Sequence, residues 1–147
     1  MEKNLSIIIP VYNEKDSLSI MVKILNSSLE FKHEIIIVYD DLNDNSVPEA
    51  KKLKEKFKNI ILVHNNIGKG VKFALQAGVE KSQYQNILIT AVDEIFPILS
   101  IDKMLNMIVI ENYDFVSGTR YANGGKRLGG SLIGHILSLL ANKSFCL

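Results

Sequence analysis

Two acidic residues interrupt an apolar stretch in the segment ITAVDEIFP, which runs from Ile89 to Pro97. Carboxylate oxygens are the ligands that hard divalent cations prefer, and such cations usually share their remaining positions with substrate phosphates. Asp93 is therefore predicted to hold a divalent cation that bridges a diphosphate, with Glu94 as a second metal ligand. The other interpretation is that the pair is only the polar end of a buried strand.

A glycine-rich, basic segment follows further along the chain, GTRYANGGKRLGG, from Gly118 to Gly130. Its composition predicts a mobile cationic loop suited to an anionic ligand. Arg120 can pair with phosphate oxygens, bidentately where the geometry allows. Three polar groups earlier in the chain each follow an apolar run. They are Asn13 with Glu14, Asp40 with Asp41, and the stretch from Asn65 to Gly70, which contains Lys69. Alone, these three groups are also explained as helix caps and turn formers.

Five apolar, β-branched runs precede these polar groups and are predicted to be buried strands, at residues 5–11, 34–39, 60–64, 86–92 and 113–118. The segments between them have helical spacing. An apolar stripe runs from Leu18 to Leu29, and Ser46 to Glu49 has the form of a capping box. Residues 70–82 and 101–111 fill the other two gaps.

Alternating strands and helices predict an α/β fold with a mainly parallel, Rossmann-like sheet and helices on both faces. Ligands of such sheets bind beyond the carboxyl ends of the strands. All of these polar groups follow strands, so they are expected to meet at that edge. Together they predict a negatively charged, nucleotide-like ligand.

Composition narrows the function further. The net charge is +1 and the pI about 7.8, with basic residues spread along the chain, so nucleic acid is not an expected partner. Cys146 is the only cysteine, which excludes an intrachain disulfide and fits a reducing compartment. The 147 residues suit one domain, residues 1–147. The apolar stretch from Leu132 to Ala141 is too short to span a membrane and predicts either a helix packed on the core or an interfacial or partner-facing helix.

In order and spacing, the segments IIIPVYNE, VYDDLND, GKGVKFALQAG, VDEIFP and GTRYANGG resemble the family-two inverting glycosyltransferases with the GT-A fold. The similarity is greatest to the branch of polyprenyl- and dolichyl-phosphate mannose or glucose synthases. The resemblance implies a nucleotide-diphosphate sugar as donor and a polyprenyl phosphate or a glycan as acceptor. It also implies Mg²⁺ or Mn²⁺ as cofactor.

The same resemblance implies roles for individual residues. The donor is expected to contact Lys69 and residues that hold the nucleoside, which are Pro10, Tyr12, Glu14 and Asp40. Asp93 and Arg120 correspond to the catalytic metal-binding acid and the phosphate-binding arginine. Ala91 stands where the family usually has the first acid of its D-x-D motif, which leaves Asp93 and Glu94 as the metal ligands.

Two other functions are compatible with parts of the pattern. A non-catalytic module that binds nucleotide sugars would tolerate Ala91. A sugar-1-phosphate nucleotidyltransferase would normally have a glycine- and arginine-rich loop after the first strand, and PVYNEKDS has none. The acceptor-binding half and any membrane-docking helices are expected beyond Leu147, so the chain is predicted to be a C-terminally truncated donor domain. It is expected in the cytoplasm, at the cytoplasmic face of a membrane if the acceptor is a lipid.

Overall fold

The computed structural model describes residues 2–118, 134, 136–138 and 141. The chain falls into two compact units, Met1–Val116 and Ser117–Leu147. The first unit carries a sheet and the helices that cover it. Because most of the second unit lies outside the described residues, the prediction of one domain over residues 1–147 stays a prediction.

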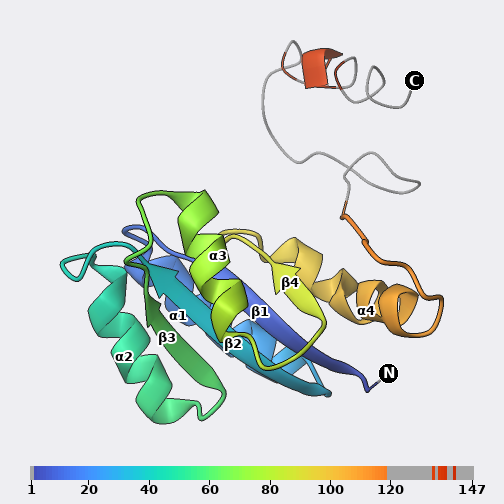
Figure 1. The fold of residues 1–147 in the computed structure, drawn as a ribbon, viewed down its shortest axis with the longest axis horizontal. Coiled ribbons are helices and arrows are strands. Elements are labelled where there is room, and N and C mark those ends of the chain that lie inside the picture. The colour runs from blue at the N-terminus through green and yellow to red at the C-terminus, as the bar shows by residue number, and fades with distance from the viewer. Residues whose placement is uncertain (1, 119–133, 135, 139–140, 142–147) are drawn as a thin grey trace. The chain divides into compact units, whose positions relative to one another are not determined.

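The first unit is built on a parallel sheet of four strands in the order β3-β2-β1-β4. Figure 1 shows the arrows of these strands running in the same direction. Residues opposite each other in neighbouring strands are themselves apolar, as in the pairs Ile7↔Ile35 and Ile8↔Ile36. The strands are β1 Asn4–Pro10, β2 Lys32–Tyr39, β3 Ile60–His64 and β4 Ile87–Ile89.

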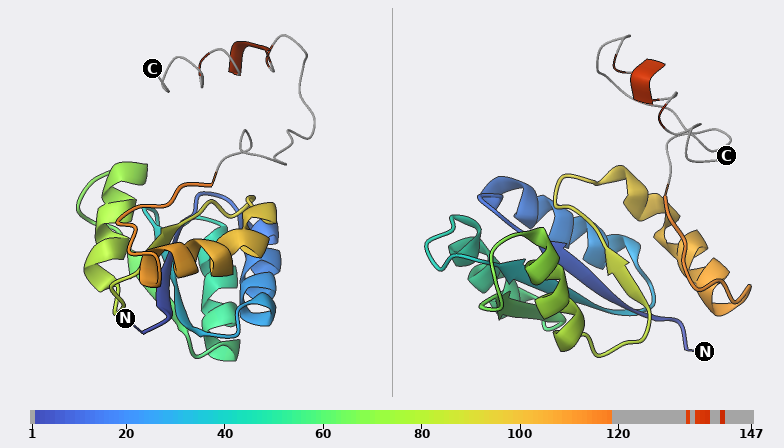
Figure 2. Two further views of the ribbon diagram at one scale, coloured as in Figure 1. Left: turned by 90° about the vertical axis from the view of Figure 1, so that its right-hand side faces the viewer. Right: turned by 45° about the horizontal axis from the view of Figure 1, so that its top comes forward.

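Helices cover both faces of the sheet, as predicted (Figures 1 and 2). Successive side chains of a strand point to opposite faces, so β1 and β2 feed two separate clusters of buried residues. The larger cluster packs under α1 and α2 together with η1 and α4, and the smaller one packs under α3. The helices are α1 Lys15–Ser28, α2 Ser46–Lys56, α3 Val71–Lys81, η1 Phe96–Ser100 and α4 Ile101–Val109.

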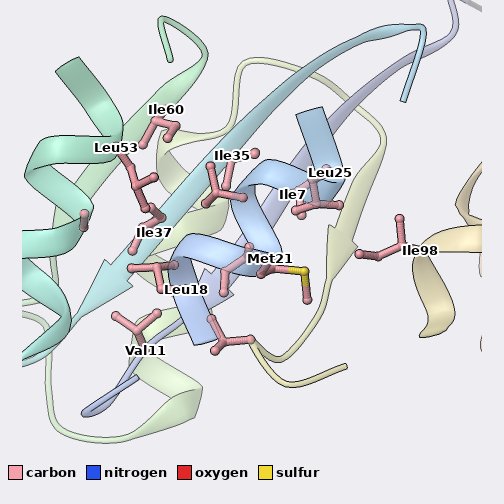
Figure 3. Packing of buried hydrophobic residues seen from close by; sticks show 14 of the residues in the cluster. Ile7, Val11, Leu18, Met21, Leu25, Ile35, Ile37, Leu53, Ile60 and Ile98 are labelled. Carbon is pink, nitrogen blue, oxygen red and sulfur yellow. The ribbon is translucent and has the colours of Figure 1, made fainter. Parts of the chain in front are cut away.

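The larger cluster forms the centre of the core (Figure 3). Leu18, Met21 and Leu25 from the predicted stripe of α1 are fully buried against Ile7 and Ile37 of the sheet. These side chains recur at helical spacing on α1 and at every second position on the strands. Burying apolar area of this kind contributes about 25 cal/mol per Å². The core therefore fixes the positions of β1 and β2, from which the first two polar loops leave.

The smaller cluster requires a glycine where α3 crosses the sheet. A Cβ atom placed on Gly78 would lie 2.6 Å from Cγ2 of Ile8, which is fully buried in β1. Carbon atoms in ordinary contact lie at about 3.5–4.0 Å, so α3 approaches the sheet too closely for any side chain.

Replacing Gly78 with Ala is expected to lower the free energy of unfolding by about 1–3 kcal/mol, because the added methyl group overpacks the contact with Ile8. The measurement is urea denaturation followed by circular dichroism. Gln76→Ala, on the exposed side of the same helix, is the control and should change stability by less than about 0.5 kcal/mol. An unchanged or increased stability of Gly78→Ala would mean that α3 lies further from the sheet.

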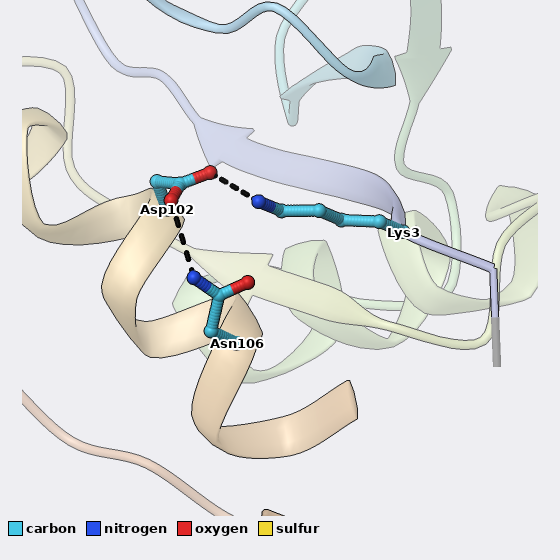
Figure 4. Close-up of polar contacts among 3 residues, drawn as sticks. All are labelled: Lys3, Asp102 and Asn106. Atoms are coloured by element: carbon cyan, nitrogen blue, oxygen red, sulfur yellow. Dashed lines mark hydrogen bonds and ion pairs between the residues drawn. The ribbon is translucent and has the colours of Figure 1, made fainter. Parts of the chain in front are cut away.

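An ion pair joins the residue before β1 to the first turn of α4 (Figure 4). Lys3 Nζ donates to Asp102 Oδ1 at 2.5 Å, and Asn106 Nδ2 donates to Asp102 Oδ2 at 3.3 Å. Both ion-pair partners are at least one-third exposed, at 36% for Lys3 and 59% for Asp102. Exposed pairs of this kind contribute about 0–1 kcal/mol. The pair therefore orients α4 without determining the fold.

Three predictions about the elements differ from the structure. Residues 113–118 are described and form no strand, so the predicted fifth strand is wrong. Tyr113 and Phe115 are 51% and 80% exposed there, and none of the described strands pairs with the segment to complete its backbone hydrogen bonds. The fourth strand is shorter than predicted. The capping box at Ser46 is also wrong, because Ser46 lies inside α2 and its hydroxyl accepts a hydrogen bond from Glu14 N–H.

Candidate functional site

Four polar loops leave the sheet at its carboxyl edge, one after each strand. They are residues 11–14 after β1, 40–45 after β2, 65–70 after β3 and 90–95 after β4. Because all strand pairs are parallel, these loops start from the same edge. This is the edge where ligands bind in open parallel sheets. The fold therefore brings together the first four polar groups that the sequence predicted.

Side chains from the loop after β2 hold the loop after β1. Asn13 N–H donates to both carboxylate oxygens of Asp44, at 3.1 and 3.0 Å, and Glu14 N–H donates to Ser46 Oγ at 2.8 Å. Lys15 N–H donates to Asn45 Oδ1 at 3.2 Å. The N–H groups of residues 13–15, where the chain enters α1, are thus satisfied by the side chains of residues 44–46, where it enters α2.

Asp40 connects the loop after β2 to the loop after β3. Its Oδ1 accepts from Asn65 Nδ2 at 2.7 Å, and its Oδ2 accepts from Gly70 N–H at 2.8 Å. Asn65 is buried, donates to Gly68 O at 2.6 Å and accepts from Ile67 N–H at 3.0 Å. Gly70 has φ +101°, a conformation that favours glycine. Asp40 is half-buried, and its two oxygens have lone pairs beyond these two bonds.

The predicted donor-binding side chains differ in their surroundings. Tyr12 is 75% exposed, and Lys69 is also exposed beside Gly70. Glu14 occupies the N-cap position of α1 but makes no side-chain capping bond, so helix capping does not explain it. Pro10 ends β1 and is half-buried. Tyr12, Glu14 and Lys69 make no side-chain hydrogen bond with another described residue, which leaves their polar atoms available to a ligand.

Asp93 and Glu94 lie in an exposed turn after β4. The turn is closed by Glu94 N–H donating to Ala91 O at 3.2 Å and by Ile95 N–H donating to Asp93 O at 3.1 Å. Neither carboxylate has a hydrogen-bond or ion-pair partner among the residues the structure describes. Ala91 is exposed at the start of the turn.

The geometry of this turn bears on the predicted metal. In the described part of the chain, no three His, Cys, Asp or Glu side chains gather at metal-binding distance. A cage made entirely of protein ligands is therefore not formed there. Mg²⁺ usually takes only one or two carboxylates and completes its shell with water and substrate phosphates. The exposed pair of Asp93 and Glu94 fits a cation of that kind, held jointly with a diphosphate.

The rest of the predicted phosphate site falls outside the described residues. This applies to Arg120 and to Lys126 and Arg127, the other two basic residues of the glycine-rich segment from Gly118 to Gly130 that was predicted to suit an anionic ligand. Their contacts with a ligand stay predictions. No helix in the described part of the chain is long and apolar enough to cross a membrane.

The sequence profile described as "Glycosyl transferase family 2" matches residues 6–143. The chain belongs to this family. It is 28% identical over 122 residues to a dolichol-phosphate mannosyltransferase of Pyrococcus furiosus, covering 82% of this chain and 34% of that protein. It is 31% identical over 122 residues to an undecaprenyl-phosphate 4-deoxy-4-formamido-L-arabinose transferase of Yersinia enterocolitica, covering 80% of this chain and 37% of that protein. The chain thus spans about a third of the length of these relatives.

Among solved structures, the chain resembles the mannosyltransferase PcManGT from Pyrobaculum calidifontis in complex with GDP-Man and Mn²⁺. The TM-score is 0.54 at 19% identity, over 60% of this chain and 27% of that one. The likeness confirms the predicted α/β fold of the GT-A type. Together with the family, it confirms that the chain is related to glycosyltransferases, as the motifs predicted.

Local sequence does not indicate that Asp44 and Asn65 join neighbouring loops at this edge. In its polar loop, Asp44 has the composition of an ordinary turn former, although its position two residues before the start of a helix is a signal for capping. Asn65 follows β3, and nothing in its local sequence indicates that its amide group joins two loops.

Proposed function

We propose that this chain is the donor-binding part of a glycosyltransferase that moves a sugar from a nucleotide diphosphate to a polyprenyl phosphate or a glycan, with inversion. The observation that carries the proposal is the gathering of four polar loops at one edge of the sheet, tied by hydrogen bonds between Asn13 and Asp44 and between Asp40 and Asn65. The names of the relatives from Pyrococcus furiosus and Yersinia enterocolitica support a lipid-phosphate acceptor.

In this proposal the nucleoside lies over the first two loops. Tyr12 presents an exposed ring on which a base can stack, and Pro10 supports the loop where β1 ends. Glu14 and Asp40 present carboxylate oxygens that accept hydrogen bonds from the base or ribose. Asp40 is the better oriented of the two, since Asn65 and Gly70 hold both of its oxygens.

The diphosphate then lies toward the third and fourth loops. Asp93 and Glu94 would hold Mg²⁺ or Mn²⁺, and Lys69 and Arg120 would contact phosphate oxygens as cations. A bound divalent cation supplies neutralisation of charge on the leaving diphosphate. Lys69 is exposed in the loop after β3 and has no hydrogen-bond or ion-pair partner among the described residues, which suits contact of its ammonium group with an anion.

With a phosphate acceptor, the chemistry requires little acid–base catalysis from the protein. The bond between the anomeric carbon and the diphosphate oxygen breaks while an acceptor oxygen forms its bond on the opposite side of the carbon, which inverts the configuration. Negative charge grows on the departing diphosphate, and fixed positive groups stabilise it in the transition state. A phosphate acceptor is already an anionic nucleophile at neutral pH, so for that acceptor we assign no strong general base. A glycan acceptor would have to lose its hydroxyl proton to a base, for which we assign no residue. We place the reaction in the cytoplasm, at the membrane face for a lipid acceptor.

Calorimetric titration of the chain with UDP and GDP, each with and without Mn²⁺ or Mg²⁺, tests the proposal. We expect one of the two nucleotides to bind, and to bind more tightly with the metal. Binding that is independent of metal would favour the non-catalytic nucleotide-sugar module. Absence of binding for both nucleotides would overturn the proposed donor site.

A further inference from the structure

Three consecutive side chains after β2 receive three consecutive backbone N–H groups after β1. Asp44 accepts from Asn13, Asn45 from Lys15, and Ser46 from Glu14. The first N–H groups of a helix have no partners inside the helix and are usually satisfied by local caps, water or a ligand. Here the N–H groups of Lys15, the first residue of α1, and of the two residues before it are satisfied from a segment about 30 residues away in sequence. We call this set of contacts the amide clamp.

Asp44 is the central residue of the amide clamp. It is 5% exposed, and its Oδ1 also accepts from Ser46 N–H at 2.7 Å, where α2 begins. A buried carboxylate needs such charge-assisted hydrogen bonds because it has lost its water. The same group therefore caps α2 and fixes the backbone that leads into α1.

The clamp also holds Asn13 in an unusual conformation. Asn13 has φ +58°, in the left-handed region that residues other than glycine adopt at a cost. Such a conformation persists only where the surroundings determine it. The two bonds from Asn13 N–H to Asp44 supply that constraint directly.

Asn13 lies between Tyr12, which is exposed, and Glu14, which is half-buried. The proposed function assigns both of these side chains to the nucleoside. A change in the backbone at Asn13 would redirect both of them. We infer that Asp44 is a positioning residue for the nucleoside half of the donor, acting through the backbone of residues 13–15 without touching the ligand. This inference rests on the proposed function.

The test compares Asp44→Asn with Asp102→Asn in the full chain. Asn keeps the size of the side chain but replaces one acceptor oxygen with an NH₂ donor facing the same backbone N–H. Asp102 is an exposed acid of α4 whose carboxylate pairs with Lys3, so it undergoes the same chemical change outside the four loops. Binding of the preferred nucleotide, UDP or GDP, is measured with Mn²⁺, and inorganic pyrophosphate with Mn²⁺ serves as a second probe.

We expect Asp44→Asn to weaken nucleotide binding about tenfold, the scale of one lost hydrogen bond to a charged group. Pyrophosphate binding should stay unchanged, because pyrophosphate lacks the nucleoside that Tyr12 and Glu14 would contact. Asp102→Asn should bind both probes like the unsubstituted chain. The selective loss separates positioning from a general loss of structure, which would weaken both probes together.

Equal nucleotide affinity in Asp44→Asn and the unsubstituted chain would overturn the inference, and so would an equal loss for nucleotide and pyrophosphate. If Asp44→Asn does not fold, Ser46→Ala replaces it, because it removes only the acceptor of Glu14 N–H, and the same outcomes apply. An unsubstituted chain that binds neither UDP nor GDP would overturn the proposed function and this inference with it. If only the inference about Asp44 is wrong, the unsubstituted chain still binds UDP or GDP.

Discussion

Asp93→Asn is expected to weaken metal-dependent binding of a nucleoside diphosphate by about 100-fold, since losing even a group that supports a metal ligand costs about 10- to 100-fold in metal affinity. Asn keeps the size of the side chain but removes the charge that would attract the cation. The structure gives Asp93 no other partner among the described residues, so the substitution should leave the fold intact. The measurement is calorimetric titration of the variant with GDP or UDP in the presence of Mn²⁺.

The control is Asp102→Asn, which makes the same chemical change at an exposed acid paired with Lys3. It should bind nucleotide like the unsubstituted chain. Glu94→Gln, measured alongside, shows whether the neighbouring carboxylate shares the cation, and a loss similar to that of Asp93→Asn is the expected result. Unchanged metal-dependent binding in both Asp93→Asn and Glu94→Gln would place the metal elsewhere.

Ile37→Ala is expected to lower the free energy of unfolding by about 2–5 kcal/mol, the range for large-to-small changes in a packed core. Ile37 is fully buried in β2, the strand between β1 and β3, and belongs to the larger cluster under α1 and α2. Removing three carbons leaves a cavity that strands held on both sides can fill only partly. Urea denaturation followed by circular dichroism measures the change.

Ile20→Ala is the matched control, because it deletes the same atoms from a side chain of α1 that is 51% exposed. It should change stability by less than about 0.5 kcal/mol. Similar losses in Ile20→Ala and Ile37→Ala would contradict the assignment of Ile37 to the core. A loss confined to Ile37→Ala would confirm that the middle of the sheet carries the stability on which the loops depend.

The strands can be predicted where burial alone determines them. Ile7, Ile8 and Ile9 are apolar in succession because both faces of β1 are covered, and such a run is typical of a buried parallel strand. Residues 113–118 also contain aromatic and β-branched side chains but form no strand. A strand requires a neighbouring strand to bond its backbone N–H and C=O groups. Whether such a neighbour exists depends on distant parts of the chain and cannot be predicted from local composition.

In the candidate site, too, local sequence predicts some features, whereas others depend on residues far away in the chain. The polar residues after each strand are predictable, because the carboxyl ends of parallel strands share one edge. The roles of Asp44 and Ser46 cannot be predicted in this way, because their partners Asn13 and Glu14 lie 31 and 32 residues away in the sequence. Local sequence makes Ser46 a helix cap, whereas the fold brings a different N–H group to its hydroxyl.

The most direct test of a donor site at this edge is the ¹H–¹⁵N spectrum of the labelled chain during titration with GDP or UDP and Mg²⁺. We predict shifts of the backbone amides in residues 12–14, 40–46, 65–70 and 91–95. The amides of Gln83 and Tyr84, bonded to Glu34 and Ser6 near the amino ends of the strands, should stay unchanged. Shifts confined to Gln83, Tyr84 and their neighbours, or no shifts with either nucleotide, would contradict a donor site at the carboxyl edge.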